Sequence, residues 1–456
     1  MDLMRELVQW VEETKYEDLP IGVIDSVKKL TIDALGVAIA GSSALGVETV
    51  ADLVLEWGGK GEASVLIRGG KVPAPHAGLV NCTMARALDF GDAHETGGGH
   101  LSETFVPVSL ILSEYAARPV SGREYILAMA LGAELSCRLR CATTVFPGWL
   151  AETFAPFGIV ATAGKLLGFT TEQFMDGMGI GYSQCSCNRQ GALVGALNIR
   201  LQQGLAASDG ITAAIMAARG ITGARDVLEG TYGLYPLYLQ NQYKREKITE
   251  GLGTEFQFTR TSLKPFPCCK HTHIPIVSTM DMMKENDIKP EEIEEIQVGT
   301  NTEAYLGCAV GDNKYRPQSV IDAQFSMPYT VASAAVRQKV FIDDFTGDAI
   351  KEEKVLEMAR RVKTRVDAEI DGLGAKVSPA VTSIRTKNGK FYSRRAEFVR
   401  GSPRDPMTWE ECVAKFRRCV PFAVSPVPGH AVDQVIQIVG RLENAPDVRE
   451  VVRLLS

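Results

Sequence analysis

The sequence predicts a mainly α protein, a large all-helical domain with an inserted, smaller α+β domain that forms a lid. Three observations favour this fold. A chain of 456 residues is longer than one hydrophobic core usually supports, so two domains are expected. Apolar residues recur at helical spacing through about the first 260 residues. Short alternating stretches typical of strands begin near residue 261, and helical spacing returns after about residue 406. We expect a helical domain of residues 1–264 and 404–456 and a lid of residues 265–403.

The helices of the first domain are predicted from spacing and from their ends. Apolar residues at helical spacing run up to Gly41, which ends the first long segment. Residues 121–124 and 170–173 have the form of capping boxes, so each opens a helix. Residues 155–167 and 201–219 are rich in small apolar side chains. Such helices can pack closely in a core, and we expect both to be buried.

The lid is predicted from a change in pattern. Residues 293–299 alternate as a strand does, and a charged helix is expected at about 350–362. Residues 381–398 alternate on both sides of Asn388-Gly389, a strong hairpin signal. The helices expected after the lid, at 408–419 and 431–455, should pack on the first domain.

Bulk properties argue against several classes of protein. A net charge of −6 and the lack of a long basic run disfavour a nucleic-acid binder. The N-terminus lacks the basic-then-apolar pattern of a secretory signal, and the apolar stretches near it are too short to span a bilayer. The ten scattered cysteines are therefore expected to be reduced thiols. We expect a cytoplasmic protein with no nucleic-acid and no membrane partner.

Four of the six histidines fall in two short stretches, residues 88–100 and 264–273. Histidine is the side chain that most readily exchanges a proton near neutral pH. The first stretch also carries carboxylates, and the second carries lysines. This distribution predicts an acid–base site built from two distant pieces of chain.

The first stretch is unlike a zinc-protease motif. That motif places two histidines four residues apart on one helix, whereas His94 and His100 are six apart. The three glycines at 97–99 would break a helix and form a loop that can approach a ligand closely. A surface loop with solvated histidines is the alternative interpretation.

The second stretch lies where helical character gives way to α+β, a position that ligand sites prefer. Its prolines stiffen it, and its Lys264, Lys270, His271 and His273 could clamp a polyanion. The alternative is a proline-rich linker with solvated charges.

Metal and cofactor motifs are not evident in the sequence. The pairs Cys185/Cys187 and Cys268/Cys269 lack the C-x-x-C spacing of a structural zinc site, which favours buried cysteines that act as small apolar residues. We find no P-loop, no dinucleotide fingerprint and no G-x-S-x-G elbow. No metal and no cofactor are expected.

Both histidine stretches resemble motifs of the MmgE/PrpD family. The resemblance rests on residues 81–90 with the acidic–histidine loop that follows, and on residues 264–273. Further segments that fit the family are 33–41, 325–329 and 405–417. The resemblance therefore covers nearly the whole chain. It implies a helical domain with an inserted α+β lid, a homodimer, and metal-independent chemistry on a small di- or tricarboxylate.

The resemblance also implies roles for single residues. Asp89 matches the aspartate of a Leu-Asp-Phe motif, and His100 matches a loop histidine that donates a proton. Lys264 and His273 match the two ends of the second motif, and Tyr305 matches an active-site tyrosine. The expected catalytic residues are Asp89, His100 and Lys264. The expected substrate-binding residues are His94, Arg200, Lys270, His273 and Tyr305.

The chemistry explains why such residues are needed. Dehydration, epimerisation and decarboxylation of a polycarboxylate each build negative charge on a carbon next to a carboxylate. Without a metal, cations or hydrogen-bond donors must stabilise that charge in a water-poor site. His100 would protonate the leaving hydroxyl or the carbanion, Asp89 would orient His100 or act as a base, and Lys264 would pair with a substrate carboxylate.

Three positions depart from the family pattern. Ala93 replaces a threonine or serine, and Leu150 stands near an expected histidine. The segment from Ile199 to Gln203 lacks the lysine and histidine of a K-x-x-H-x-G motif, where Arg200 offers a replacement cation. We expect a hydro-lyase acting on a small polycarboxylate. The alternatives are an epimerase or decarboxylase of the same fold, or a catalytically silent relative that binds a carboxylate.

Overall fold

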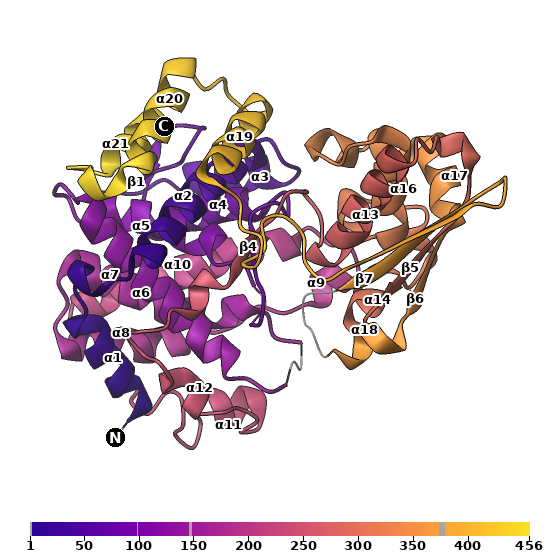
Figure 1. Ribbon diagram of the computed structural model, residues 1–456. Helices are drawn as coiled ribbons and strands as arrows, with labels where there is room; N and C mark the ends of the chain where they lie inside the picture. The colour runs from indigo at the N-terminus through magenta and orange to yellow at the C-terminus, as the bar shows by residue number, and fades with distance from the viewer. Residues whose placement is uncertain (1, 98, 146–147, 374–378) are drawn as a thin grey trace.

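The computed structural model describes residues 2–97, 99–145, 148–373 and 379–456, and it shows two lobes (Figure 1). The protein is mainly helical, as the sequence predicts, and both chain termini lie in the larger, helical lobe. The helices of this lobe are α1 (Leu3–Glu13), α2 (Ile21–Gly41), α3 (Val47–Trp57), α4 (Ala74–Arg86), α5 (Ser102–Tyr115), α6 (Gly122–Cys141), α7 (Ala155–Leu167), α8 (Thr171–Tyr182), α9 (Gln190–Leu193), α10 (Asn198–Ala218), α11 (Leu234–Leu239), α12 (Glu246–Thr249), α19 (Trp409–Cys419), α20 (Gly429–Gly440) and α21 (Arg449–Leu454). None of these described helices is long and apolar enough to cross a lipid bilayer.

The two predicted capping boxes are confirmed at α6 and α8. The Ser121 hydroxyl accepts from the Glu124 main-chain N–H, and the Glu124 carboxylate accepts from the Ser121 N–H at 2.9 Å. Thr170 and Gln173 make the same reciprocal pair at the start of α8. Each box satisfies two N–H groups that the helix itself leaves without partners.

Small residues let the central helices pack closely. A Cβ at Gly41 on α2 would lie 1.9 Å from the main-chain oxygen of Met84 on α4. A Cβ at Gly204 on α10 would lie 2.2 Å from the Leu79 oxygen, also on α4. These glycines therefore permit the contacts of α4 with α2 and α10, and α4 leads directly into the first histidine stretch.

The C-terminal helices return to the helical lobe, as expected. Lys415 on α19 pairs with Asp33 on α2 at 2.8 Å and donates to the Phe90 main-chain oxygen at 2.6 Å. The prediction of one continuous helix over 431–455 is wrong, because the chain breaks between α20 and α21. Gly440 ends α20, and Pro446 lies in the connection, where both residues disfavour a continuing helix.

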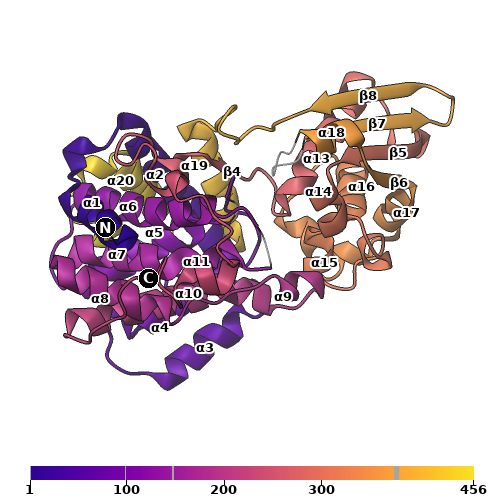
Figure 2. The same ribbon diagram turned by 90° about the horizontal axis from the view of Figure 1, so that it is seen from below.

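The smaller lobe is built on a four-stranded sheet of order β6-β5-β7-β8 (Figure 2). The strands are β5 (Ile293–Thr300), β6 (Val362–Val366), β7 (Ala380–Thr386) and β8 (Phe391–Ala396). The helices of this lobe are α13 (His273–Glu285), α14 (Thr302–Cys308), α15 (Val320–Gln324), α16 (Met327–Arg337), α17 (Glu353–Arg361) and α18 (Ala368–Gly372). The predicted hairpin at Asn388-Gly389 joins β7 to β8. The sequence did not show β6, which pairs parallel to β5 and starts directly after α17.

Two buried apolar clusters follow the two lobes. The larger runs from Leu3 to Leu263 and resumes from Met407 to Leu455. The smaller runs from Cys268 to Ile384. The division of the chain into residues 1–264 with 404–456 and residues 265–403 stays a prediction, and a third, small cluster joins Phe90 of the larger lobe to Phe341 of the smaller.

Short two-stranded ribbons complete the structure, and one of them positions the site. β1 (Ala63–Ser64) pairs with β2 (Lys71–Val72). β3 (Asp92–His94) pairs antiparallel with β4 (Thr261–Leu263), so the two histidine stretches lie side by side. The Lys264 N–H extends this ribbon by donating to the Gly91 main-chain oxygen at 3.0 Å.

Candidate active site

A cavity of about 210 Å³ lies beside the β3–β4 ribbon, and residues of both lobes line it. Five of the expected site residues line this cavity, and they are Asp89, His94, His100, Lys264 and Lys270. The prediction that two distant stretches of chain meet is therefore confirmed by the ribbon and the cavity.

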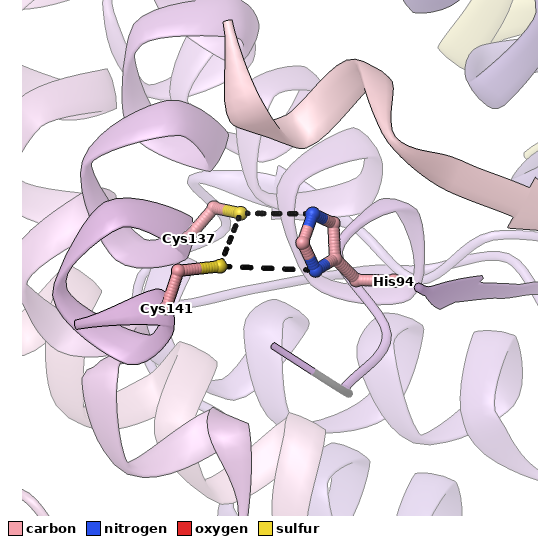
Figure 3. Close-up of side chains that lie close together, drawn as sticks. All are labelled: His94, Cys137 and Cys141. Carbon is pink, nitrogen blue, oxygen red and sulfur yellow. Dashed lines mark hydrogen bonds between the residues drawn. The ribbon is translucent and has the colours of Figure 1, made fainter. Parts of the chain in front are cut away.

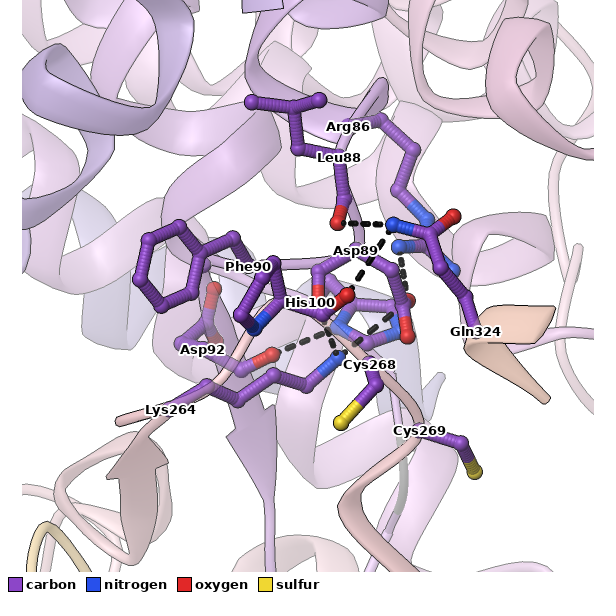
Figure 4. Close-up of polar contacts among 12 residues, drawn as sticks. Arg86, Leu88, Asp89, Phe90, Asp92, His100, Lys264, Cys268, Cys269 and Gln324 are labelled. Atoms are coloured by element: carbon purple, nitrogen blue, oxygen red, sulfur yellow. Dashed lines mark hydrogen bonds and ion pairs between the residues drawn. The ribbon is translucent and has the colours of Figure 1, made fainter. Parts of the chain in front are cut away.

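Asp89 is the centre of a buried ion network (Figure 4). Its carboxylate pairs with Arg86 one helical turn earlier, with Lys264 at 3.2 Å and with Arg200 at 3.6 Å. The side chain is almost fully buried. Burial alone would raise the pKa of Asp89, but Lys264, Arg86 and Arg200 together hold it well below its usual range. Asp89 therefore stays ionised.

Lys264, the last residue before the smaller lobe, joins the second histidine stretch to this network. Only 1% of Lys264 is exposed, and its ammonium also donates to the main-chain oxygen of Asp89 at 3.1 Å. Residue 89 has a positive φ of 52°, in the left-handed region, which turns the chain sharply after α4. The chain between α4 and β3 and the start of the lid are thus joined by one buried lysine.

His100 is oriented by a main-chain group. Its Nδ1–H donates to the Asp92 carbonyl oxygen at 2.5 Å, so the lone pair of the neutral ring lies on Nε2. Burial, together with the nearby cations of Arg86 and Lys264, lowers the pKa of His100 well below 6.5. The ring is therefore neutral at neutral pH, with Nε2 able to accept a proton. The orienting contact comes from Asp92 rather than from Asp89, the residue expected to orient His100.

Glu103, in the first turn of α5, is a site residue that the sequence prediction missed. One carboxyl oxygen accepts from the Gly91 N–H at 3.2 Å. The other lies 3.6 Å from Arg86 Nε and 3.9 Å from His100 Nδ1. Burial raises the pKa of Glu103 to about 8, although Arg86 opposes this shift. The spacing of three residues after His100 was a signal that could have identified it.

Four basic side chains from three segments line the cavity beside the ion network, and they are Arg140, Arg189, Lys270 and His271. Lys270 pairs with Glu95 at 3.0 Å. Burial lowers the pKa of Arg140 to about 10, so this side chain is still a cation at neutral pH. Arg140 comes from the end of α6, far from either histidine stretch, and no sequence signal linked it to them. A cavity lined in this way suits an anion with more than one carboxylate.

The three departures from the family pattern meet in this cavity. Ala93, Leu150 and Ile199 all line it. Trp149 and Phe325 add further apolar surface. The lining of the cavity therefore combines charged side chains such as Asp89 and Lys264 with apolar side chains at the positions that depart from the family pattern.

Gln203 and Glu152 are further lining residues that the sequence prediction did not select. The Gln203 amide donates to the Glu152 carboxylate at 2.7 Å, and both residues are buried. Gln202 instead makes two hydrogen bonds with the main chain of Asn188, at 2.5 and 2.7 Å. The segment that lacks the family's lysine and histidine thus still contributes an amide to the cavity.

Three expected substrate-binding residues do not line the cavity of the described structure. Arg200 lies behind Asp89 and also donates to the side chain of Gln324. His273 is fully buried, and its Nε2–H donates to the Cys268 main-chain oxygen at 3.1 Å. Tyr305 lies half-buried on α14. Arg200 therefore supports the wall of the cavity through Asp89, whereas His273 is a buried side chain packed against Phe266.

His94 lines the cavity, but both of its ring nitrogens already have partners. Its Nε2–H donates to the Gln257 main-chain oxygen at 2.9 Å, and its Nδ1 accepts from the Gly97 N–H at 2.8 Å. Within the described part of the chain, His94 also belongs to the one group of histidine, cysteine and acidic side chains close enough to hold a metal ion, with Cys137 and Cys141 (Figure 3).

Comparison with known proteins agrees with the fold and the motifs. Family models of the MmgE/PrpD N-terminal domain and the MmgE/PrpD C-terminal domain match residues 5–246 and 266–441. A cis-aconitate decarboxylase of Aspergillus terreus (strain NIH 2624 / FGSC A1156) is 25% identical over 475 residues, covering 99% of this chain and 95% of the relative. Cis-aconitate decarboxylase-like protein oryM of Aspergillus oryzae is 23% identical, covering 99% and 96%. A cis-aconitate decarboxylase of Homo sapiens is 23% identical over 400 residues, covering 85% and 80%.

Proposed function

The chain belongs to the MmgE/PrpD family, and from that premise we propose that it is a lyase that dehydrates a small di- or tricarboxylate. The observation that carries this proposal is the state of His100, a neutral ring whose Nδ1–H is held by the Asp92 carbonyl. Such a ring can remove a proton from a carbon next to a carboxylate. Decarboxylation would instead require a proton donor at this position.

Cationic side chains around His100 suit the charge that this step creates. When the C–H bond breaks, its electron pair moves toward the neighbouring carboxylate. Lys264 and Arg86 line the cavity and would stabilise that charge, and Arg140 and Lys270 would bind a second carboxylate of the substrate. The protonated His100 would then give its proton to the hydroxyl that leaves as water. The reaction written in this way uses no metal or organic cofactor.

Asp89 has a supporting part in this proposal. Its carboxylate already holds three cations and stays ionised, so it is the counter-charge that keeps Arg86 and Lys264 together in a buried site. Without it, those two cations would repel each other. We therefore propose that Asp89 acts through Lys264 and Arg86 and that His100 is the base.

A second candidate reaction is decarboxylation, because the relatives of known name are cis-aconitate decarboxylases. Epimerisation is a further outcome of the same first step, since a carbanion that is reprotonated on its other face changes only its configuration. The apolar side chains in the lining of the cavity, Ala93, Leu150 and Ile199, favour a substrate that carries a hydrocarbon substituent as well as its carboxylates.

Proton NMR of the protein with di- and tricarboxylates in deuterated water tests the proposal. The panel would contain citrate-like hydroxyacids with and without alkyl substituents, cis-aconitate and amino-linked disuccinates. A vinyl signal from a hydroxyacid would support dehydration. Release of carbon dioxide from cis-aconitate would instead identify a decarboxylase. Deuterium uptake without an alkene would indicate an epimerase. Binding with neither exchange nor turnover would indicate a catalytically silent carboxylate-binding protein.

We also propose that the protein is a homodimer. Large apolar side chains are exposed on and next to α3, α9 and α10, including Trp57, Leu193, Val194 and Leu205. Arg189 and Ala192, which line the cavity, belong to the same segment as α9, so a dimer formed there would border the site. Light scattering after size exclusion would measure the mass of the assembly, and a monomer at micromolar concentration would contradict this proposal.

A further inference from the structure

His94 at the end of β3 and two cysteines of α6 lie close together (Figure 3). Cys137 and Cys141 are one turn apart on α6, and their sulfurs are 3.8 Å apart. The edge of the His94 ring faces both sulfurs, with Nε2 at 3.3 Å from Cys137 Sγ and Nδ1 at 3.9 Å from Cys141 Sγ. One ligand atom from each residue lies within 4.8 Å of the other two.

The separation of the two sulfurs matches an edge of a metal tetrahedron, and the 3.9 Å from Nδ1 to Cys141 Sγ is slightly longer than such an edge. With Zn–S bonds of about 2.3 Å and Zn–N bonds of about 2.0–2.1 Å, two sulfurs lie about 3.8 Å apart and a sulfur and a nitrogen about 3.5 Å apart. The observed separation of the two sulfurs is 3.8 Å. Two thiolates and an imidazole form a soft ligand set, and their two negative charges neutralise a divalent ion in a largely buried place.

His94 has the support that a metal-binding histidine usually has. Its Nε2–H donates to the Gln257 main-chain oxygen at 2.9 Å, which leaves the lone pair on Nδ1. Gln257 is itself fixed, because its N–H donates to the Glu134 carboxylate at 2.9 Å. Glu134 in turn pairs with Arg138 at 2.6 Å, and both of these side chains are fully buried. The ring is therefore held in the tautomer that can bind a metal through Nδ1.

The loop leaves room for an ion. A Cβ at Gly97 would lie 2.9 Å from Cys141 Sγ and 3.1 Å from His94 Nδ1, so any side chain there would fill the place between them. In this structure the Gly97 N–H is the partner of Nδ1, at 2.8 Å, and a metal would replace it. Thr96 is exposed, and its hydroxyl lies 3.8 Å from Cys141 Sγ, so this side of the site is near the surface.

We propose that His94, Cys137 and Cys141 bind one thiophilic divalent ion, of which Zn²⁺ is the natural example, and that this ion fastens the loop carrying His100 to α6. His94 borders the cavity but neither cysteine lines it, so the ion would lie beside the cavity and not among Asp89, Lys264 and His100. The role of the ion is to stabilise the structure. This inference departs from the expectation that the chain has no metal site, which depended on C-x-x-C spacing and did not consider cysteines one helical turn apart.

Cobalt is a suitable probe because Co²⁺ prefers the same ligands and absorbs light through its bonds to thiolates. The full-length protein, reduced with a phosphine, would be titrated with Co²⁺ and followed in the near ultraviolet. We expect a thiolate band that saturates at one ion per chain and disappears when Zn²⁺ is added. Zn²⁺ should also raise the unfolding temperature of the protein, because it binds only the folded chain.

Single substitutions locate the site. Cys137→Ser and Cys141→Ser should each weaken binding by more than the roughly 10–100-fold that loss of a supporting partner costs. Cys185→Ser is the matched control, since Cys185 is also buried but donates to the Gly181 carbonyl and lies in no such group. Circular dichroism would show which variants fold.

Three results would overturn the proposal. The folded protein could give no thiolate band with excess Co²⁺. The band could be unchanged in the folded Cys141→Ser variant, which would place the ion elsewhere. Mass spectrometry could instead find a Cys137–Cys141 disulfide in the protein as purified, with no metal bound after reduction, which would identify an oxidisable pair.

Discussion

His94 and His100 stand at the two ends of one loop, and their neighbours give them opposite properties. His100 lies within a set of full charges that includes Arg86, Lys264 and Asp89. His94 lies against two cysteines. The residue type and the local sequence are similar, so the difference comes from side chains that other segments bring to each ring. Segments far away in the sequence therefore decide what each histidine can do.

The two rings also differ in which nitrogen is free. Each donates one N–H to a main-chain oxygen, His100 from Nδ1 and His94 from Nε2. The lone pair consequently lies on Nε2 of His100 and on Nδ1 of His94. The first is surrounded by cations that keep the ring neutral, and the second points toward thiols. We interpret the first ring as a base and the second as a ligand.

Replacing Asp89 should have the largest effect on stability and turnover. The Asp89→Asn change leaves Arg86, Lys264 and Arg200 as buried cations without their shared counter-charge. We expect a loss of about 3–5 kcal/mol in the free energy of unfolding and no measurable turnover. Urea denaturation would measure the loss.

The exposed Glu285–Arg394 pair is the control for this prediction, since Glu285→Gln should cost less than about 1 kcal/mol. A similarly small loss for Asp89→Asn would contradict the idea that Asp89 is the counter-charge that stabilises these three buried cations.

Replacing the two histidines in parallel should separate their roles. His100→Gln should lower kcat by about 10²–10⁴-fold, because the base is lost, while Co²⁺ binding stays. His94→Gln should leave most of kcat and abolish the thiolate band of bound Co²⁺. Steady-state kinetics on the substrate found by NMR, with the cobalt titration, would measure both. The interpretation fails if the two variants lose the same property.

Much of the helical architecture can be predicted from the sequence. The capping boxes at Ser121 and Thr170 and the turn at Asn388-Gly389 are local signals, and the structure has all three. The strand β6 was not predicted, because Val362 to Val366 follows the charged helix directly and is largely exposed, and its pairing with β5 is not a local signal. Local patterns therefore predict elements well where the stabilising contacts are themselves local.

The same distinction applies to the site. Asp89, His100 and Lys264 could be selected because they stand in dense motifs, and the β3–β4 ribbon brings them together. Arg140 and Cys141 could not, since α6 meets the loop only through tertiary packing. His273 stands in a motif but is fully buried against Phe266, so its motif position does not place it in the cavity. Burial depends on contacts with other segments, so it cannot be predicted from residue spacing.

The pH dependence of catalysis tests whether the His100 ring is neutral. Its pKa in the folded protein lies well below 6.5, first through burial and then through Arg86 and Lys264. The base therefore remains unprotonated as the pH falls through 6.5, and the acidic limb of kcat/KM should lie below that value. The free energy of unfolding should also fall as the pH drops below about 6.5. In that range the unfolded chain takes up a proton on His100 and the folded chain does not. An acidic limb above pH 6.5 would show that the ring is not held neutral.

Glu103→Gln should give the smallest effect, and it tests whether the charges around His100 act as one set. Burial raises the pKa of Glu103 to about 8, and the negative charges of Asp92 and Asp89 contribute to this rise. The cations Arg86 and Lys264 oppose it. Between pH 4.5 and 8 the unfolded chain releases this proton while the folded chain keeps it, so stability should fall as the pH rises. The slope cannot exceed about 1.4 kcal/mol per pH unit for one proton. Glutamine carries no such proton, so the variant should lose that slope in urea unfolding measured across this range, and its acidic limb of kcat/KM should stay where it is. A slope equal to that of the unaltered protein would mean that Glu103 is ionised at neutral pH and pairs with Arg86, and the environment of His100 would then hold one more negative charge than we infer.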